Sequence, residues 1–423
     1  DFIRTTEERH KVACQKIWSI LQDNGHIKLG KYEGWYSVRD ETFFTESELV
    51  DGRAPTGAPV EWVEEPSYFF NLSAWQDKLL AFYDENPRFV GPQSRFNEVK
   101  SFVKSGLRDL SVSRASFKWG VPVPGDDNHV MYVWLDALTN YLTAAGWPES
   151  GPSGDEEKYT RLWPADLHMV GKDILRFHAV YWPAFLMAAN LPLPKRIYAH
   201  GWWTNDGQKI SKSLGNAIDP NHLAATFGLD QTRYFLMREV PFGNDGDFSV
   251  QAITQRSNGD LANDLGNLSQ RVLSMVFKHC DGIMPALPQS MEPADEELLK
   301  SVDSLLIDVR RHIDNQAFHE LLRIIWRVIS QANRYIDSIA PWALRKTNPS
   351  RMAEALAVVA ETIRKIAILL QPVIPESAGK ILDQLGVDPT QRDFNFLIGE
   401  ARLASGQRIL KPEPVFPRFV DEG

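Results

Sequence analysis

A change of pattern near residue 250 constrains the fold of this chain more than any other feature of its sequence. Between Ser111 and Ala225, short apolar segments alternate with longer segments of helical spacing. Beyond Gln251, nearly every segment places its apolar residues three to four positions apart. Alternating strands and helices predict a parallel α/β sheet with ligands at the carboxyl ends of its strands. The continuous helical spacing that follows predicts an all-α bundle.

The expected elements follow from this periodicity. In the α/β part, we expect strands at 130–134, 167–170 and 196–200, and helices at 136–145 and 174–190. In the helical part, we expect helices at 253–278, 294–313, 317–339, 349–370 and 375–385. The chain should begin with a helix over 7–24, with Thr5 or Thr6 as its cap and Gly25 as its stop.

Residues 27–110 have a different character. Aromatic pairs such as Trp35-Tyr36 and Phe43-Phe44 lie among glycine, proline and acidic residues. This composition predicts a small β-rich insertion, followed by two short helices at 73–85 and 95–105.

A chain of 423 residues is longer than one hydrophobic core usually supports, so we expect two to three domains.

Charge and cysteine content narrow the class of protein. A net charge of −9 argues against a surface that is basic all over, but leaves room for a local nucleic-acid groove. No apolar run approaches the roughly 20 residues of a membrane helix, so we expect no membrane partner and a cytoplasmic location. Cys14 and Cys280 form no C-x-x-C pair, and the histidines show no clustered spacing. We therefore expect no metal site and no structural zinc.

The segment Lys209-Ile210-Ser211-Lys212-Ser213 is the first candidate for chemistry. Its two ammonium groups and two hydroxyls are suited to holding pyrophosphate as it leaves in a phosphoryl or adenylyl transfer. The preceding Thr204-Asn205-Asp206-Gly207 predicts a hairpin turn, so this anion clamp should follow a strand end. The alternative is an ordinary solvated turn.

A second candidate lies around two strand-to-helix junctions. Trp134, Ala137 and Tyr141 surround the first junction, while His178 and Trp182 share one helix face at i and i+4. Aromatic rings pack well around a thioether, and a hydroxyl or imidazole donor can meet the weak lone pair of its sulfur. The alternative is a buried aromatic core with a satisfied histidine.

After another strand end come Gly171 and Asp173. The glycine permits close approach of the backbone to a ligand, and the carboxylate is placed to accept hydrogen bonds from ribose hydroxyls. These two residues therefore predict a nucleoside site.

The order and spacing of these motifs resemble those of a known family. The run H-G-W…K-I-S-K-S-L-G-N…D-P resembles the signature loop of class I aminoacyl-tRNA synthetases, with Ile210 in place of the usual methionine. An apolar swap of similar volume should be tolerated there. Together with W-L-D-A…Y and G-K-D-I…F-H…W-P, this run is similar to the methionyl-tRNA synthetases over essentially the whole chain. Leu138 departs from their frequent proline, which affects packing beside the pocket only.

The resemblance implies ATP with Mg²⁺, L-methionine and tRNA(Met) as substrates and partners, with a monomer favoured. It implies that Lys209, Ser211, Lys212 and Ser213 serve catalysis, with Lys212 at the ATP phosphates. The nucleotide would also contact Gly171, Asp173 and Arg114. The methionine pocket would comprise Trp134, Ala137, Tyr141, Phe177, His178 and Trp182.

The helical part carries two further motifs. Asn267 and Arg271 lie at i and i+4 in N-L-S-Q-R, and Trp342 follows a helix end in A-P-W, free to stack on a splayed base. Similar motifs read the CAU anticodon in the family, so the resemblance implies the same for these three residues. The alternative places Trp342 in the core and Arg271 on a solvated face.

The implied architecture is a partial Rossmann-type catalytic domain with a connective insertion, followed by an α-helical anticodon-binding domain. We expect residues 1–26 and 111–225 to form the catalytic domain and residues 27–110 the insertion, of the type without zinc. Residues 226–250 should form a stem-contact linker, and residues 251–423 the anticodon-binding bundle.

One family motif is not found. Class I synthetases carry an H-I-G-H string whose histidines stabilise the phosphates, and no such string occurs here. His26-Ile27 resembles it only superficially. Because the first residue is Asp1, we expect a chain without its beginning. Because the H-I-G-H histidines are missing, we also expect this chain to be inactive by itself. Two rival interpretations are a non-catalytic tRNA-binding protein derived from a synthetase, and a sister synthetase for leucine, isoleucine or valine, although the insertion is short for the latter.

Overall fold

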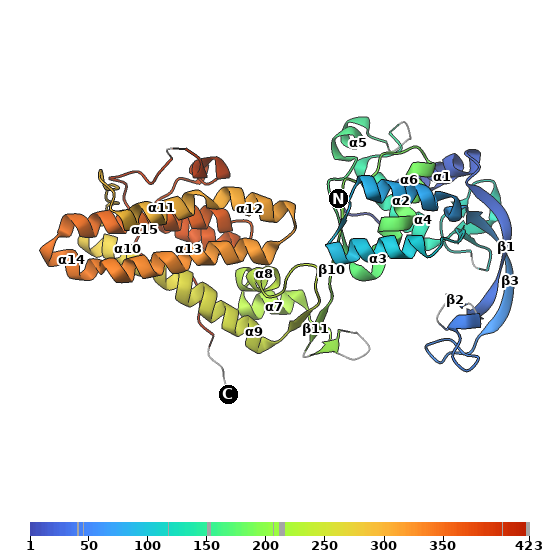
Figure 1. The fold of residues 1–423 in the computed structure, drawn as a ribbon, viewed down its shortest axis with the longest axis horizontal. Coiled ribbons are helices and arrows are strands. Elements are labelled where there is room, and N and C mark those ends of the chain that lie inside the picture. Colours follow the sequence, from blue (N-terminus) through green and yellow to red (C-terminus); the bar gives the residue numbers. More distant parts are fainter. Residues whose placement is uncertain are drawn as a thin grey trace. The chain divides into compact units, whose positions relative to one another are not determined.

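The computed structural model describes residues 1–39, 42–44, 46–116, 118–149, 154–205, 207–210, 216–399 and 401–419. The chain forms two compact units, Asp1–His200 and Gly201–Gly423 (Figure 1). Each unit buries a hydrophobic core of its own, built from residues of that unit alone. Among the described residues, no helix combines the length and the apolar character needed to cross a membrane.

The first unit contains a three-stranded parallel sheet in the order β4-β10-β9. Its strands are β4 (Val90–Gly91), β9 (His168–Gly171) and β10 (Ile197–His200). After β9 the chain enters the short helix η3 (Lys172–Ile174), the π-helix η4 (Phe177–Tyr181) and helix α6 (Trp182–Ala188). The strands expected at 167–170 and 196–200 are therefore confirmed, as is the helical character of the segment between them.

The expectation of a parallel strand at 130–134 is wrong. Strand β8 (Asp126–Met131) ends earlier and lies in a separate sheet, antiparallel to β6 (Ser113–Arg114) and β7 (Pro122–Val123). The reason is the tight turn before β8, where Gly125 adopts a φ of 78° and returns the chain alongside β7. Helix α4 (Val133–Ala145) then begins inside the expected strand.

The expected insertion is β-rich at its start. Strands β1 (Ile27–Ser37), β2 (Thr42–Phe44), β3 (Glu61–Phe70) and β5 (Leu110–Ser111) form an antiparallel sheet in the order β2-β1-β3-β5. The two helices expected after the strands are present as α2 (Gln76–Glu85) and α3 (Gln93–Lys104), with η2 (Leu72–Trp75) leading into α2. Strand β4 also comes from residues 27–110, yet it pairs with β10. The domain boundaries stay predictions.

Helix α1 (Glu8–Asp23) confirms the expected first helix, but not its cap. The N-cap position is Glu7, whose side chain makes no capping hydrogen bond, so neither Thr5 nor Thr6 serves. Gly25 stops the helix with a φ of 76°. Helix α5 (Glu156–Leu162) follows α4.

The second unit begins with a small sheet and continues as helices. The sheet has the order β12-β11-β13, with strands β11 (Trp203–Asn205), β12 (Gln208–Lys209) and β13 (Gly246–Phe248). The helices are α7 (Pro220–Phe227), α8 (Leu229–Arg238), α9 (Val250–Arg256), the π-helix η6 (Ser257–Gly266), α10 (Asn267–His279), α11 (Pro293–Asp303), α12 (Leu305–Asp314), α13 (Phe318–Ile339), α14 (Pro341–Thr347), α15 (Pro349–Leu370) and α16 (Pro375–Gln384). Short 3₁₀ turns lie at η1 (Glu46–Glu48) in the first unit and at η7 (Pro389–Gln391) and η8 (Phe394–Leu397) in the second.

The predicted bundle is confirmed. Helix α15 is its centre, because it is buried from Ala355 to Leu370 and packs against α10, α11, α13 and α16 (Figure 1). Two predicted helices are interrupted, by the π-helical residues of η6 and by a break at Ser304. Helix α14 was not expected; Ala340, with a φ of 48°, turns the chain into it. Apolar periodicity continues through both interruptions, so it could not reveal them.

Candidate functional site

The aromatic residues predicted to form a pocket come together in the first unit. Helix α4 carries Trp134, Ala137 and Tyr141 on one face, because these positions are three and four residues apart. The ring of Phe177 stacks on that of Trp134, with centroids 3.4 Å apart and an interplanar angle of 10°. The ring of Trp182 lies 6.4 Å from that of Tyr141.

A hydrogen bond orients two of these side chains. The Nδ1 of His178 lies 2.9 Å from the carbonyl oxygen of Ile174, so Nδ1 carries the proton and donates it. The Nε2 of His178 is then an acceptor, and the hydroxyl of Tyr141 donates to it at 2.7 Å. Burial lowers the pKa of His178 and raises the pKa of Tyr141, so the imidazole stays neutral and the phenol keeps its proton.

The arrangement has a buried floor and a partly open wall. His178 and Trp182 are buried, as the core interpretation requires, whereas Trp134, Tyr141 and Phe177 are only partly buried. Such a site can enclose an apolar side chain between aromatic faces. It also presents polarizable rings to a sulfur atom.

His168 is a neighbour that the sequence analysis missed. Its ring lies 4.1 Å from that of Tyr141, and its Nε2 finds no hydrogen-bond partner among the described residues. Burial, together with the nearby His178, lowers the pKa of His168 to about 3. One feature of the sequence could have indicated His168. It is the first residue of β9, where a side chain can face the aromatic residues of the strand-to-helix junction.

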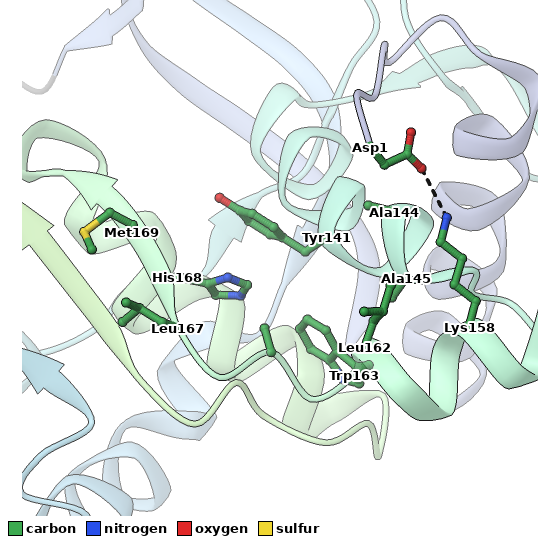
Figure 2. Close-up of a pocket in the computed structure, with 11 residues that line it drawn as sticks. Asp1, Tyr141, Ala144, Ala145, Lys158, Leu162, Trp163, Leu167, His168 and Met169 are labelled. Atoms are coloured by element: carbon green, nitrogen blue, oxygen red, sulfur yellow. Dashed lines mark hydrogen bonds and ion pairs between the residues drawn. The ribbon is translucent and has the colours of Figure 1, made fainter. Parts of the chain in front are cut away.

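Tyr141 and His168 also line a pocket of about 390 Å³ (Figure 2). The pocket continues along helices α4 and α5, where Lys158 forms an ion pair of 3.2 Å with Asp1 (Figure 2). Of the six residues predicted to bind methionine, only Tyr141 lines this pocket.

The residues predicted to bind the nucleotide lie at the end of β9 and on β6. A Cβ atom at Gly171 would come within 2.5 Å of the Oδ1 of Asp173, so the glycine lets the exposed carboxylate fold back over the strand end. Arg114 donates to the Ser111 hydroxyl at 2.6 Å, and its guanidinium lies 4.0 Å from the ring centroid of Tyr132, directly before α4.

The predicted hairpin before the signature loop is confirmed. Strands β11 and β12 are antiparallel, with Thr204 opposite Lys209. The carboxylate of Asp247 accepts hydrogen bonds from the Thr204 hydroxyl at 2.5 Å and from the Gly207 amide at 2.8 Å. These bonds lower the pKa of Asp247, so the turn is held by a charged acceptor. The side chain of Lys209, and all of Ser211, Lys212 and Ser213, lie outside the described residues.

The three residues predicted to read an anticodon lie on one side of the helical bundle. Asn267 and Arg271 line a groove of about 500 Å³ along α10, with Gln270, Ser274, Met275, Lys278 and His279. The guanidinium of Arg271 lies 5.6 Å from the ring of Trp342 and donates to Asp337 at 2.9 Å. Trp342 is 49% exposed, so it is not a core anchor.

The structure also gathers side chains that could hold a metal. The Nε2 of His10, the Sγ of Cys14 and a carboxylate oxygen of Asp136 all lie within 4.8 Å of one another. This group was not expected from the sequence, because Asp136 is 122 positions from Cys14 along the chain. The sequence offered one indication of this group, the i, i+4 spacing of His10 and Cys14 on one helix.

Comparison with known proteins was made for the whole chain. The family model "tRNA synthetases class I (M)" matches residues 1–61 and 48–273, and "Anticodon binding domain of methionyl tRNA ligase" matches residues 286–423. A methionine–tRNA ligase of Rickettsia felis is 57% identical over 99% of this chain and 81% of its own length. One of Brucella suis is 55% identical over 100% of this chain and 81% of its own length.

Solved structures agree with these relatives. The structure of Mycobacterium tuberculosis methionyl-tRNA synthetase bound by methionyl-adenylate is 54% identical, with a TM-score of 0.92. The match covers 99% of this chain and 83% of that one.

Proposed function

The chain belongs to the class I methionyl-tRNA synthetases, and we propose that it takes part in the ATP-dependent attachment of L-methionine to tRNA(Met) in the cytoplasm. The observation that carries the methionine assignment is the aromatic cluster around the oriented Tyr141–His178 pair. Trp134, Ala137 and Phe177 would line the side-chain pocket, above a floor formed by His178 and Trp182.

The reaction needs no nucleophile from the protein. A carboxylate oxygen of methionine attacks the α-phosphorus of ATP, the bond from that phosphorus to the bridging oxygen breaks, and pyrophosphate leaves with the electron pair. The 2′-hydroxyl at the tRNA 3′ end then attacks the methionyl carbonyl carbon, and the bond from that carbon to the phosphate oxygen breaks. AMP leaves with the electron pair, and the hydroxyl proton passes to solvent. Positioning and electrostatic stabilisation supply the rate enhancement.

We assign the charge stabilisation to Lys209 and Lys212, helped by the hydroxyls of Ser211 and Ser213. Mg²⁺ enters with the ATP phosphates as part of the substrate. Gly171 and Asp173 would hold the ribose, because the glycine leaves room for the carboxylate at the strand end. Arg114, held by Ser111 and Tyr132, would line the site beside α4.

We assign base recognition to Asn267, Arg271 and Trp342. An amide and a guanidinium line one groove, and the partly exposed indole beside it can stack on a base. A single tRNA(Met) anticodon loop would therefore meet both hydrogen-bonding and stacking groups.

We also propose that these 423 residues form methionyl adenylate only slowly by themselves, because their sequence contains no H-I-G-H string. The test is methionine-dependent exchange of pyrophosphate into ATP. It compares this chain with a longer protein that also carries an H-I-G-H segment. We expect exchange from the longer protein only, with methionine and not with leucine, isoleucine or valine. No exchange from either protein would favour a non-catalytic tRNA-binding protein.

In the longer protein, Lys212→Ala should slow exchange with little change in methionine affinity, since its charge matters in the transition state. A single stabilising group of this kind is worth roughly 100- to 1,000-fold in rate. An unchanged rate would remove Lys212 from the mechanism. Lys278→Ala, in the groove on α10, is the matched control and should leave exchange unaffected.

A further inference from the structure

Three electron-pair donors converge where α1 packs against α4 in the first unit. The Nε2 of His10 lies 2.7 Å from the Oδ1 of Asp136 and 3.3 Å from the Sγ of Cys14, and the sulfur lies 3.9 Å from the same carboxylate oxygen. His10 and Cys14 are fully buried, and the Asp136 side chain is 14% exposed. Of these three side chains, that of Asp136 alone is partly exposed.

A hydrogen bond on the other side of the imidazole orients the ring of His10. The Thr143 hydroxyl donates to the carbonyl oxygen of Thr139 at 3.2 Å, so it accepts the hydrogen bond from the Nδ1 of His10 at 3.0 Å. With the proton on Nδ1, the imidazole of His10 turns the lone pair of Nε2 toward the carboxylate and the sulfur. In that tautomer a positive centre between these atoms, a bound cation or a second proton, offsets the repulsion between lone pairs 2.7 Å apart.

We propose that His10, Cys14 and Asp136 form a binding site for a zinc-like divalent cation, which joins α1 to the first turn of α4. Tetrahedral zinc has bonds of about 2.0–2.1 Å to nitrogen, 2.3 Å to sulfur and 2.0–2.2 Å to oxygen, which separates ligand atoms by roughly 3.3–3.6 Å. The three separations here, 2.7, 3.3 and 3.9 Å, lie on both sides of that range. Small rotations of the side chains would therefore bring the three atoms to the spacing that zinc requires. Water or a neighbouring oxygen would complete the coordination.

The surroundings fit this cation better than Mg²⁺ or Ca²⁺. A nitrogen and a sulfur ligand select borderline-soft metals, and Thr143 supplies the second hydrogen bond that commonly orients a metal-bound histidine. Only a thiolate is a metal ligand, so the ion must displace the thiol proton of Cys14 to bind. Affinity should rise about tenfold per pH unit for each proton released.

This site would not appear in a search along the sequence. The expectation of no metal rested on cysteine pairs and on histidine spacing, whereas this site combines one turn of α1 with a carboxylate from α4. Its ligands also differ from the residues assigned to methionine and ATP.

The test uses Co²⁺ as a spectroscopic probe on the full 423-residue chain. We expect one Co²⁺ per chain, with a thiolate-to-cobalt charge-transfer band and strong tetrahedral d–d bands that Zn²⁺ removes and Mg²⁺ does not. Cys14→Ser should lose the charge-transfer band, and Asp136→Asn should weaken binding about tenfold or more. Cys280→Ser replaces the other cysteine of the chain and is the matched control, which should behave like the parent.

A second measurement needs no variant to fold. Because Cys14 is fully buried, its alkylation reports transient opening of the site. Bound Zn²⁺ should slow this alkylation at least tenfold, while alkylation of Cys280 keeps its rate. The absence of a charge-transfer band, a band that depends on Cys280, or alkylation of Cys14 that zinc does not slow would each overturn the proposal. A purely hydrogen-bonded cluster would give the first and third of these results.

Discussion

At the scale of single residues, the candidate methionine pocket depends on two uncharged histidines. Their neighbours within the described residues are aromatic rings, a phenol and a backbone carbonyl, and none of these can neutralise an imidazolium. Burial accordingly lowers the pKa of both His168 and His178. The neutral imidazole of His178 can then accept a hydrogen bond from the Tyr141 hydroxyl, which sets the position of the phenol ring.

The first prediction concerns that hydroxyl. Tyr141→Phe leaves the buried Nε2 of His178 without its donor, so the free energy of unfolding should fall by about 1–3 kcal/mol. Urea unfolding measures the change. Tyr181→Phe is the control, because the Tyr181 hydroxyl makes no hydrogen bond within the described residues, and it should change stability less. Equal losses from both variants would show that the Tyr141–His178 bond contributes no stability of its own.

The second prediction concerns pH. An unfolded histidine titrates near pH 6.5, whereas folded His168 has a pKa of about 3. Between these values the unfolded chain holds a proton that the folded chain does not. The free energy of unfolding should therefore fall as the pH drops through this window, by at most about 1.4 kcal/mol per pH unit.

Urea unfolding at pH 7 and pH 5 tests whether the free energy of unfolding falls as the pH drops. His168→Gln should reduce the loss of stability between the two pH values, whereas His279→Gln, at an exposed site on α10, should leave it as in the parent. A pH dependence that survives His168→Gln unchanged would show that other groups cause it.

At the scale of elements, α10 and α14 together form the candidate anticodon surface. Helix α10 contributes the groove with Asn267 and Arg271, and α14 presents Trp342 beside the Arg271 guanidinium. The left-handed conformation of Ala340 turns the chain between α13 and α14, so the indole sits in the first turn of a new helix.

The third prediction tests this surface. The full chain should bind a CAU anticodon stem-loop more tightly than a scrambled loop, and Trp342→Ala should remove most of this preference. One stacked base is worth about 1–3 kcal/mol. The salt dependence should remain nearly the same, because it reports phosphate contacts. Titrations at two salt concentrations measure both quantities.

Trp119→Ala is the matched control, since Trp119 is also exposed, at 76%, but lies in the first unit. It should keep the preference for CAU. If the chain binds both loops equally, or if Trp342→Ala keeps the preference, the assignment of Trp342 to base recognition is wrong.

At the scale of the whole molecule, each of the two units has its own core. The core of the second unit includes an ion cluster: Asp295 is fully buried and accepts two hydrogen bonds from Arg351, at 2.7 and 2.9 Å. The hydroxyl of Tyr335 donates to the same carboxylate. The cluster joins α11, α13 and α15, so we expect it to stabilise the second unit and not the first.

The fourth prediction follows. Asp295→Ala leaves the Arg351 guanidinium buried without its main partner, so the second unit should lose about 3–5 kcal/mol of stability. Hydrogen exchange in urea, followed separately for the two units, should show an earlier transition in the second unit alone. Asp383→Ala breaks the more exposed pair with Arg392 and should cost less than about 1 kcal/mol. A shift confined to the first unit would contradict the prediction.

The sequence by itself determined the α/β part followed by the bundle, the β-rich segment that begins at Ile27, the hairpin before Lys209 and the family. All of these depend on local periodicity, on turn residues or on motifs that are contiguous in the chain. Trp134, Tyr141 and His178 of the aromatic cluster could be named for the same reason, because their motifs are local. Their burial and the direction of the Tyr141 hydrogen bond could not be inferred from the sequence.

Only the tertiary structure decided which elements are partners. It placed β4 beside β10, turned β8 into an antiparallel sheet, and brought His168 against Tyr141. It also put Asp136 within reach of His10 and Cys14. The physical reason is that periodicity records which face of an element is buried, whereas the partner of that face is set by long-range packing between segments far apart in the chain.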